Sequence, residues 1–366
     1  MNDRVRIAIL GPGDVATRDY LPEFHRLEDR AEIVAVCGRG EERARAVAGD
    51  IGVPWFTDQS HMNDDIEIDA TVNLTPIQAH EATTRTALEA GHHVYSEKPL
   101  AMSTAAATEL RDLARGRGLA LVAAPSVLLF PQVRLAGELL ASGEIGPVHT
   151  VRGLGYGGVP PWPGYDSDPT PFFVPGAGPL VDLGVYPLHA ITGLLGPARN
   201  VSAMSIRSAD GFDITEGPFA GRHIPIEVDD AWTVALELGD RCLGTVEANF
   251  TSHGTRAGEL ELMGERGTIS LDLLDVAAPL QLLDASGAWG EIAVAAERAE
   301  GGPDHVLGVE HLVECIVDGR RPVASADHAI HVLEILEASG VSAVSGASVP
   351  LDSTFPFDHE PRRRDP

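Results

Sequence analysis

The N-terminal part of the chain alternates apolar runs with helical patterns, and this alternation constrains the fold more than any other feature. The apolar run Val5–Leu10 leads into a glycine-containing turn, Gly11-Pro12-Gly13, which opens a helical pattern over residues 14–28. Further strand candidates follow at 31–37, 69–74, 92–96 and 119–124, with helical patterns at 41–49, 78–90 and 103–116. Strands that alternate with helices in this way predict a parallel sheet over residues 1–124.

The glycine turn has the residue types that a dinucleotide-binding turn requires. Gly11 permits the tight turn, Gly13 lets the backbone approach a pyrophosphate, and the small Ala16 allows close packing of helix on strand. Backbone amides at the start of the helix then face the phosphates. Gly11, Gly13, Asp14 and Val15 are therefore candidate cofactor-binding residues. A carboxylate pointing into this turn would repel phosphate, so we expect Asp14 to cap the helix instead.

A second motif, Glu97-Lys98-Pro99, follows the strand candidate at 92–96. Ligands of doubly wound sheets gather at the carboxyl ends of the strands. A residue before proline is biased toward extended backbone, so Lys98 should project from the strand end. Taken alone, the tripeptide would favour a surface Lys-Pro turn. Its place downstream of the glycine turn favours a catalytic lysine beside a nucleotide.

A third motif occupies residues 176–189 and continues as an apolar helix to Leu195. At about 100° per residue, Asp182, Tyr186 and His189 fall on one narrow face of this helix. The three ionisable side chains are candidate catalytic residues. The alternative is that Asp182 serves the helix dipole while Tyr186 and His189 are edge residues of an amphipathic helix.

Together these three motifs resemble the Gfo/Idh/MocA family of oxidoreductases, which is named for glucose-fructose oxidoreductase and inositol dehydrogenase. Other segments share the resemblance: Asn73-Leu74-Thr75-Pro76 with His80, and residues 87–91, 264–269 and 318–322. The resemblance implies that Lys98 is the catalytic lysine, that Glu97 neighbours the nicotinamide ribose, and that Asp182 is the family's aspartate. It also implies cofactor contacts by Thr75, Pro76 and His80, and assembly into homodimers or homotetramers.

Two positions on the third motif depart from the family pattern. Many members have histidine where this chain has Tyr186, which is the residue of the glucose-fructose oxidoreductase-like branch. Inositol dehydrogenases place an aspartate where this chain has His189. Tyr186, His189 and Lys98 therefore all remain candidates for the proton transfer that accompanies hydride transfer.

The end of the second strand candidate bears on the choice of cofactor. NAD-binding proteins usually place an acidic residue there for the ribose 2′-hydroxyl, whereas this chain has Gly38-Arg39. A guanidinium suits a 2′-phosphate. The sequence favours NADP(H), with Arg39 as a cofactor-binding residue, and leaves NAD(H) open because Glu41 or Glu42 could reach the ribose.

The second part of the chain, residues 125–366, has a different pattern. Longer strand candidates lie at 148–155, 200–206, 230–239, 242–250, 258–263 and 267–273, with helical patterns at 130–142, 305–317 and 326–345. They predict an α+β domain, built on a large, mostly antiparallel open sheet, that follows an α/β Rossmann domain. The loop 156–179 carries Trp162, Tyr165, Phe172 and Phe173, which would pack equally well on a sugar ring or on a partner subunit.

Composition excludes several classes of function. A formal charge of −27 argues against nucleic acid or an anionic membrane as a partner. Cys37, Cys242 and Cys315 fit neither a disulfide framework nor a zinc site, and adjacent His92 and His93 would face opposite sides of a strand, so we expect no metal. Met1 is followed almost at once by the first strand, which leaves no room for a signal peptide and predicts a cytoplasmic protein.

The sequence thus predicts an NAD(P)-dependent dehydrogenase or reductase acting on a sugar, cyclitol or related polyol. Two alternatives stay open. One is a glycosidase that uses bound nicotinamide for transient oxidation and elimination. The other is a non-enzymatic cofactor-sensing regulator, against which the retention of Lys98, Asp182 and Tyr186 argues.

Overall fold

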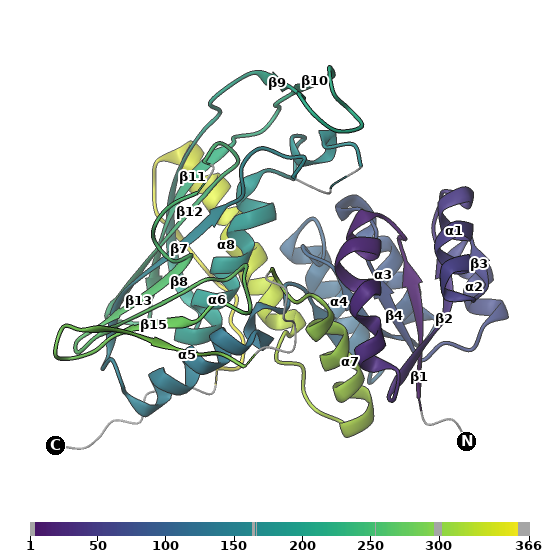
Figure 1. Ribbon diagram of the computed structural model, residues 1–366, viewed down its shortest axis with the longest axis horizontal. Helices are drawn as coiled ribbons and strands as arrows, with labels where there is room; N and C mark the ends of the chain where they lie inside the picture. The colour runs from purple at the N-terminus through teal and green to yellow at the C-terminus, as the bar shows by residue number, and fades with distance from the viewer. Residues whose placement is uncertain (1–3, 163–164, 166, 253, 296–301, 358–366) are drawn as a thin grey trace. The chain divides into compact units, whose positions relative to one another are not determined.

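The computed structural model describes residues 4–162, 165, 167–252, 254–295 and 302–357. The chain separates into two compact units (Figure 1). The first combines Met1–Ser126 with Asp304–Ile330, and the second combines Val127–Pro303 with His331–Pro366. The segment 304–330 therefore returns to the first unit after the chain has formed most of the second.

Within its described residues, the first unit holds a six-stranded parallel sheet in the order β3-β2-β1-β4-β5-β6. The strands are β1 (Val5–Leu10), β2 (Ala31–Cys37), β3 (Trp55–Phe56), β4 (Ala70–Asn73), β5 (His93–Ser96) and β6 (Leu121–Ala123). β1 lies between β2 and β4, so the chain changes direction across the sheet at β1. Crevices for ligands form at such a switch point, at the carboxyl ends of the strands.

Alternating side chains of the first sheet enter two separate cores. Ile7 and Ile9 of β1 pack with residues of β4, β6 and α7 (Val306–Asp318), whereas Ala8 and Leu10 pack with Met62 of α2 (Gln59–Asp65). Helices therefore cover both faces, as a buried parallel sheet requires. The remaining helices of this unit are α1 (Glu41–Ile51), α3 (His80–Glu89) and α4 (Thr104–Gly116).

The helix expected over residues 14–28 is irregular. A π-helical segment, η1 (Ala16–Tyr20), is followed by a 3₁₀ segment, η2 (Leu21–Leu27), with Pro22 near its start. Proline is tolerated only in the first turn of a helix, which explains why the helical type changes at this point. π-helical turns are rare and often occur at functional sites.

In the described part of the second unit, nine strands form one sheet in the order β16-β15-β14-β13-β7-β12-β11-β8-β17. All neighbours are antiparallel except β7 and β12, so the expected mostly antiparallel sheet is confirmed. The strands are β7 (Val148–Tyr156), β8 (Ala198–Ile206), β11 (Ala231–Leu238), β12 (Cys242–Asn249), β13 (Leu260–Gly264), β14 (Thr268–Leu271), β15 (Leu280–Leu283), β16 (Trp289–Ile292) and β17 (Val349–Pro350).

Helices cover one face of this large sheet (Figure 1). They are α5 (Pro131–Ser142), α6 (Val185–Leu195) and α8 (Ala326–Ser345). Along β11, Val234, Leu236 and Leu238 are buried while the residues between them are exposed. Large apolar side chains also lie on the exposed face, with Met204 77% and Leu243 62% exposed. Among the described residues, no helix combines the length and the apolarity needed to cross a membrane.

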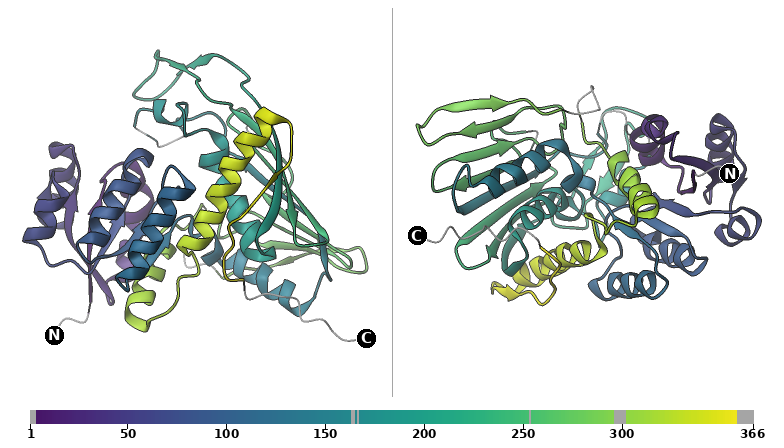
Figure 2. Two further views of the ribbon diagram at one scale, coloured as in Figure 1. Left: turned by 180° about the vertical axis from the view of Figure 1, so that it is seen from behind. Right: turned by 90° about the horizontal axis from the view of Figure 1, so that it is seen from below.

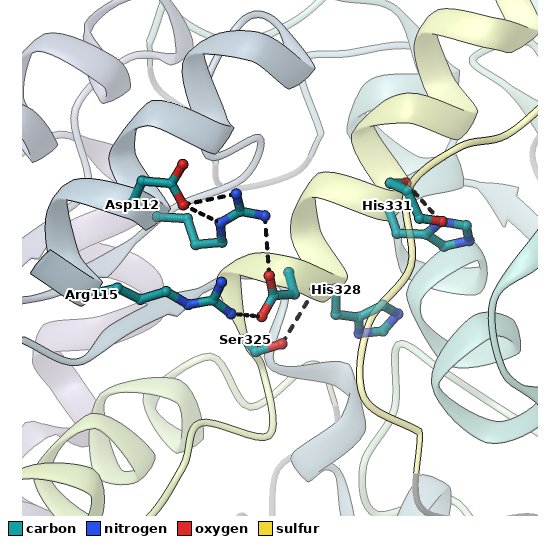
Figure 3. Close-up of polar contacts among 8 residues, drawn as sticks. Asp112, Arg115, Ser325, His328 and His331 are labelled. Carbon is teal, nitrogen blue, oxygen red and sulfur yellow. Dashed lines mark hydrogen bonds and ion pairs between the residues drawn. The ribbon is translucent and has the colours of Figure 1, made fainter.

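Helix α8 begins in the first unit and continues in the second. At its start Asp327 pairs with Arg111 and Arg115 of α4, and the backbone N–H of His328 donates to Ser325 Oγ at 3.2 Å (Figure 3). An acidic residue in the first turn of a helix complements the helix dipole. Further along, Ser342 Oγ accepts a hydrogen bond from the N–H of Ala203 in β8, beside which α8 runs (Figure 2).

Several short elements were not indicated by the sequence. They are β3, α2, β15, β16, β17 and the two-stranded ribbon of β9 (Gly211–Asp213) and β10 (His223–Pro225). Each strand has two to four residues. Such strands are too short to display the alternation from which strands are inferred, whereas the equally short β4, β5 and β6 were indicated by their place between helical patterns.

Candidate active site

The carboxyl ends of the first unit's strands form one edge, because their terminal residues pair in register. Leu10 pairs with Cys37 on one side and Asn73 on the other, Asn73 pairs with Ser96, and Ser96 pairs with Ala123. The residues that come next in the chain therefore lie along this edge. They include Gly11, Gly38 and Glu97.

The turn after β1 fits only glycine at its first position. Gly11 has a φ of +78°, and a Cβ there would lie 2.6 Å from Leu74 O and from Thr75 N. The turn is thus packed directly on the loop that follows β4. At Gly13, by contrast, the described residues place no heavy atom within 4 Å of a Cβ. A dinucleotide's pyrophosphate requires close approach to backbone at the start of a helix, and the open backbone at Gly13 permits that approach.

Asp14 does not have the role that the sequence predicted. Its Oδ1 pairs with the guanidinium of Arg43, which also donates from Nε to Pro12 O at 2.8 Å. The N-cap of η1 is Val15, where the described contacts include no side-chain cap. The correction has an electrostatic reason, because Arg43 compensates a carboxylate that would otherwise repel phosphate in this turn.

The end of β2 carries the residues that bear on cofactor choice. Gly38 lies against Pro12, since a Cβ at Gly38 would be 2.6 Å from Pro12 Cδ. Arg39, Glu41 and Glu42 are exposed next to this contact. Both the candidate ligand of a 2′-phosphate and the candidate ligands of a ribose hydroxyl are therefore accessible.

His80 connects two loops of the strand edge. Its Nε2 lies 2.6 Å from Thr75 O and its Nδ1 lies 2.8 Å from Pro99 O. The ring is 1% exposed, and burial lowers the pKa of His80, while both carbonyl contacts act in the opposite direction. The buried ring of His80 therefore links the Thr75-Pro76 turn to the Lys98-Pro99 turn. Pro76, in contrast, is exposed.

Asn73, the last residue of β4, fixes the first of those loops. Its Oδ1 accepts from Thr75 N–H at 3.2 Å and from Thr75 Oγ1 at 2.7 Å. Its Nδ2 lies within hydrogen-bond distance of three oxygens of α3: His80 O, Thr83 Oγ1 and Thr84 Oγ1. A fully engaged side-chain amide of this kind holds the backbone around it rigidly.

Glu97 and Lys98 follow β5 at the same edge. The N–H of Glu97 donates to Asn73 O at 2.9 Å, and the N–H of Lys98 donates to Glu97 Oε2 at 2.9 Å. Glu97 Oε1 accepts from the hydroxyl of Tyr20 at 2.5 Å. Glu97 is 9% exposed, whereas Lys98 is only half-buried. A buried carboxylate therefore holds the backbone of a half-buried lysine.

In the second unit, Asp182, Tyr186 and His189 are all buried, with exposures of 5 to 9%. Asp182 lies in a π-helical segment, η6 (Leu180–Gly184), which runs directly into α6. The wider turn changes the angular spacing assumed for an ideal α-helix. Burial lowers the pKa of His189 to about 4, and its Nδ1 lies 2.9 Å from Val185 O. His189 is therefore neutral near pH 7, and its Nδ1–H donates to this carbonyl.

A row of glycines sets how closely this helix approaches the sheet. A Cβ at Gly155 of β7 would lie 2.7 Å from Gly184 N, and one at Gly153 would lie 2.5 Å from Pro187 Cβ. A Cβ at Gly184 itself would lie 3.0 Å from the Cβ of Ala248 in β12. Glycine inside a strand often marks such a close backbone approach. Close packing on these glycines therefore positions η6 and α6.

The aromatic side chains of the 156–179 loop pack on one another. Phe173 is 1% exposed and contacts Phe212 and Phe250, and Trp162 makes edge contacts with Phe172, Phe250 and Tyr165. An ion pair at 2.8 Å between Asp168 and Arg222 joins this loop to the segment before β10. Parts of the loop, residues 163, 164 and 166, lie outside the described residues.

Three features of the site were missed from the sequence. Tyr20, Arg43 and the Gly153–Gly155 pair all depend on contacts between segments far apart in the chain. A compositional signal for the site was nevertheless available, because Lys98 is the only lysine among 27 Lys and Arg residues. In the part of the chain that the structure describes, no group of three or more His, Cys, Asp or Glu side chains is arranged to hold a metal ion.

Comparison with known proteins agrees with this geometry. Residues 5–124 match the family model described as an oxidoreductase family with an NAD-binding Rossmann fold, and residues 133–270 match the GFO/IDH/MocA C-terminal domain. Two dTDP-3,4-didehydro-2,6-dideoxy-alpha-D-glucose 3-reductases are each 32% identical. The match to that of Streptomyces violaceoruber covers 73% of this chain and 72% of the relative, and the match to that of Streptomyces antibioticus covers 56% and 61%.

Among solved structures, an NAD binding oxidoreductase from Klebsiella pneumoniae superimposes with a TM-score of 0.80. The two chains are 23% identical, and the match covers 96% of this chain and 100% of the other. Similarity at this level of identity establishes the fold: a Rossmann unit and a large, mostly antiparallel sheet.

Proposed function

This chain is a member of the Gfo/Idh/MocA family of oxidoreductases, and we propose that it transfers hydride between NADP(H) and a carbinol or carbonyl carbon of a sugar, cyclitol or related polyol. A nicotinamide bound at the strand edge would supply the hydride donor or acceptor. The names of the two Streptomyces relatives support a sugar ring carbon as the reacting centre.

The observation that carries the proposal is the setting of Lys98. Of the 27 Lys and Arg residues of the chain, all but one are arginine. The single lysine lies at the carboxyl end of β5, next to a buried glutamate. An ammonium is a compact charge that can donate a proton, whereas a guanidinium stays protonated. In carbonyl reduction, Lys98 would stabilise the negative charge that develops on the substrate oxygen.

The proton transfer is assigned to Tyr186. His189 is neutral near pH 7, because burial lowers its pKa to about 4, so in carbonyl reduction it has no imidazolium proton to donate. It suits binding of a neighbouring substrate hydroxyl. Asp182 is assigned to orienting the substrate or the lysine. Tyr186, assisted by Lys98, then exchanges the proton with the reacting oxygen.

The cofactor assignment rests on Arg39, which is exposed beside the glycine turn and suits a 2′-phosphate. Thr75 and Pro76 are assigned to the opposite wall of the cofactor site, since their loop packs on Gly11.

We also propose assembly into a homodimer or homotetramer, through the exposed face of the large sheet that carries Met204 and Leu243.

The role of Lys98 is tested by Lys98→Met, which keeps the length of the side chain and removes its charge. We expect the variant to bind the dinucleotide as the unmutated protein does and to lose at least about a hundredfold in turnover. Dinucleotide affinity and single-turnover rates measure the two effects separately. A folded, cofactor-bound variant with normal turnover would show that Lys98 has no part in the chemistry.

A further inference from the structure

Tyr20 is a buried phenol that contacts the carboxylate next to Lys98. It is the last residue of η1, the segment that follows the glycine turn, and it is 1% exposed. Its hydroxyl donates to Glu97 Oε1 at 2.5 Å and lies 2.9 Å from the hydroxyl of Tyr95. A hydroxyl has one proton to donate, so the proton between the two phenols comes from Tyr95. The order of donation is Tyr95 to Tyr20 to Glu97.

The carboxylate of Glu97 is therefore held on both sides. Oε1 is fixed by Tyr20, and Oε2 accepts the N–H of Lys98 itself at 2.9 Å. Burial and the Glu97 carboxylate both hold the pKa of Tyr20 well above its usual value, so the phenol stays protonated and keeps donating. Tyr20 thus links the segment after the glycine turn to the backbone of Lys98.

The surroundings hold the two phenols in place. A Cβ at Gly308 of α7 would lie 2.3 Å from the ring of Tyr95, which is fully buried. The ring of His305 lies 5.7 Å from that of Tyr20, centroid to centroid. Helix α7 belongs to the segment that returns to the first unit at residue 304. Close packing of this segment leaves the rings little freedom to turn.

We propose that Tyr20 is a positioning residue for the reaction: it fixes Glu97, and through Glu97 it sets the place of Lys98 relative to the cofactor turn. The inference rests on the proposed role of Lys98. Hydrogen bonds to a carboxylate are about twice as strong as those between neutral groups. Loss of the Tyr20 hydroxyl should therefore disturb the site more than loss of the Tyr95 hydroxyl, although both residues are buried in one cluster.

The chain offers an unusually clean test, because Lys98 is its only lysine. Protein labelled with ¹⁵N-lysine gives one backbone amide resonance, that of the N–H that donates to Glu97. Tyr20→Phe should shift this resonance, and the matched control Tyr95→Phe should leave it nearly in place. This readout needs neither a substrate nor activity, so it remains informative if the proposed function fails.

Activity then separates positioning from general destabilisation. We expect Tyr20→Phe to lower kcat about tenfold, the scale of one hydrogen bond to a charged group, with KM changed less than about twofold. Tyr95→Phe should keep kcat within about twofold. Thermal unfolding of both variants gives the destabilisation for comparison.

A double-mutant cycle with Glu97→Gln completes the test. If Tyr20 acts through Glu97, adding Tyr20→Phe to Glu97→Gln should lower kcat little further. The inference is overturned if the two phenylalanine variants shift the lysine resonance equally, if their losses of kcat follow their losses of stability, or if the effects of Tyr20→Phe and Glu97→Gln on kcat multiply. Normal turnover of Lys98→Met would reject the proposed function instead, whatever the resonance shows.

Discussion

The candidate site residues fall into two halves, one in each unit, and different interactions position the two halves. Around Lys98 in the first unit, side-chain hydrogen bonds of Tyr20, Asn73, His80 and Glu97 fix the loops after β4 and β5. Near Asp182 and Tyr186 in the second unit, the helical segment is fixed by close packing on the glycines of β7.

This difference suits what each half is proposed to do. A hydrogen-bond network sets the direction and protonation of polar groups, which an ammonium beside a developing oxyanion requires. Packing of backbone on backbone sets position and tolerates no added atoms, which suits a helix that must present several groups to one substrate. The position of the first half should thus be sensitive to loss of polar atoms that take no part in the chemistry, and the position of the second half to gain of volume.

The largest effect is expected for Tyr186→Phe, which removes a hydroxyl from the packed helix and keeps its ring. We expect the single-turnover rate to fall at least about a hundredfold with little change in unfolding temperature. His189→Ala should chiefly weaken substrate binding. An unimpaired rate for Tyr186→Phe, beside a collapsed rate for His189→Ala, would transfer the proton-transfer role to His189.

A smaller effect, specific to packing, is expected for Gly155→Ala, whose Cβ would lie 2.7 Å from Gly184 N. Overpacking of this kind costs about 1–3 kcal/mol of stability, and displacement of η6 should lower turnover about tenfold. Gly290→Ala is the matched control, because the described residues leave space for a Cβ at that position of β16 in the same sheet. If the two variants had the same unfolding temperature and the same turnover, the claim that close packing positions the second half would be wrong.

The smallest effect is expected for Arg39→Ala at the cofactor edge. The unmutated protein should bind NADP(H) more tightly than NAD(H), and the substitution should narrow that preference severalfold, because one exposed charge contact with the phosphate is lost. Arg45→Ala, an exposed arginine on the following helix α1, controls for the change in net charge. Comparable affinities for the two cofactors in the unmutated protein, or a preference that Arg39→Ala leaves unchanged, would refute the assignment.

Much of the fold was predictable because local patterns determine it. Strands β1 and β2 and helix α8 have the bounds expected from the sequence, since buried strands and a long apolar helix carry strong periodic signals. The glycine turn was equally predictable from the sequence, because Gly11 needs a positive φ that other residues rarely adopt. Short or half-exposed elements such as β15 and β16 carry no such signal.

The site was less predictable, because it depends on contacts between distant segments. Tyr20 reaches Glu97 across 77 positions of sequence, and nothing local to either residue indicates the pair. The carboxylate of Asp14 was expected at a helix cap and instead pairs with Arg43 on another helix. Likewise, no pattern within residues 304–330 indicates that they join the first unit.

The measurement that tests the central claim most directly is a screen of sugars, sugar nucleotides and cyclitols with each nicotinamide, following the absorbance of the reduced cofactor. Hydride transfer predicts that at least one class of substrate gives a stoichiometric change in absorbance, that this change is faster with NADP(H) than with NAD(H), and that Lys98→Met slows it at least about a hundredfold. Release of aglycone from a glycoside without net change in the cofactor would contradict the account and establish a nicotinamide-dependent glycosidase. Binding of the dinucleotide without turnover of any substrate in the screen would contradict it in favour of a cofactor-sensing protein.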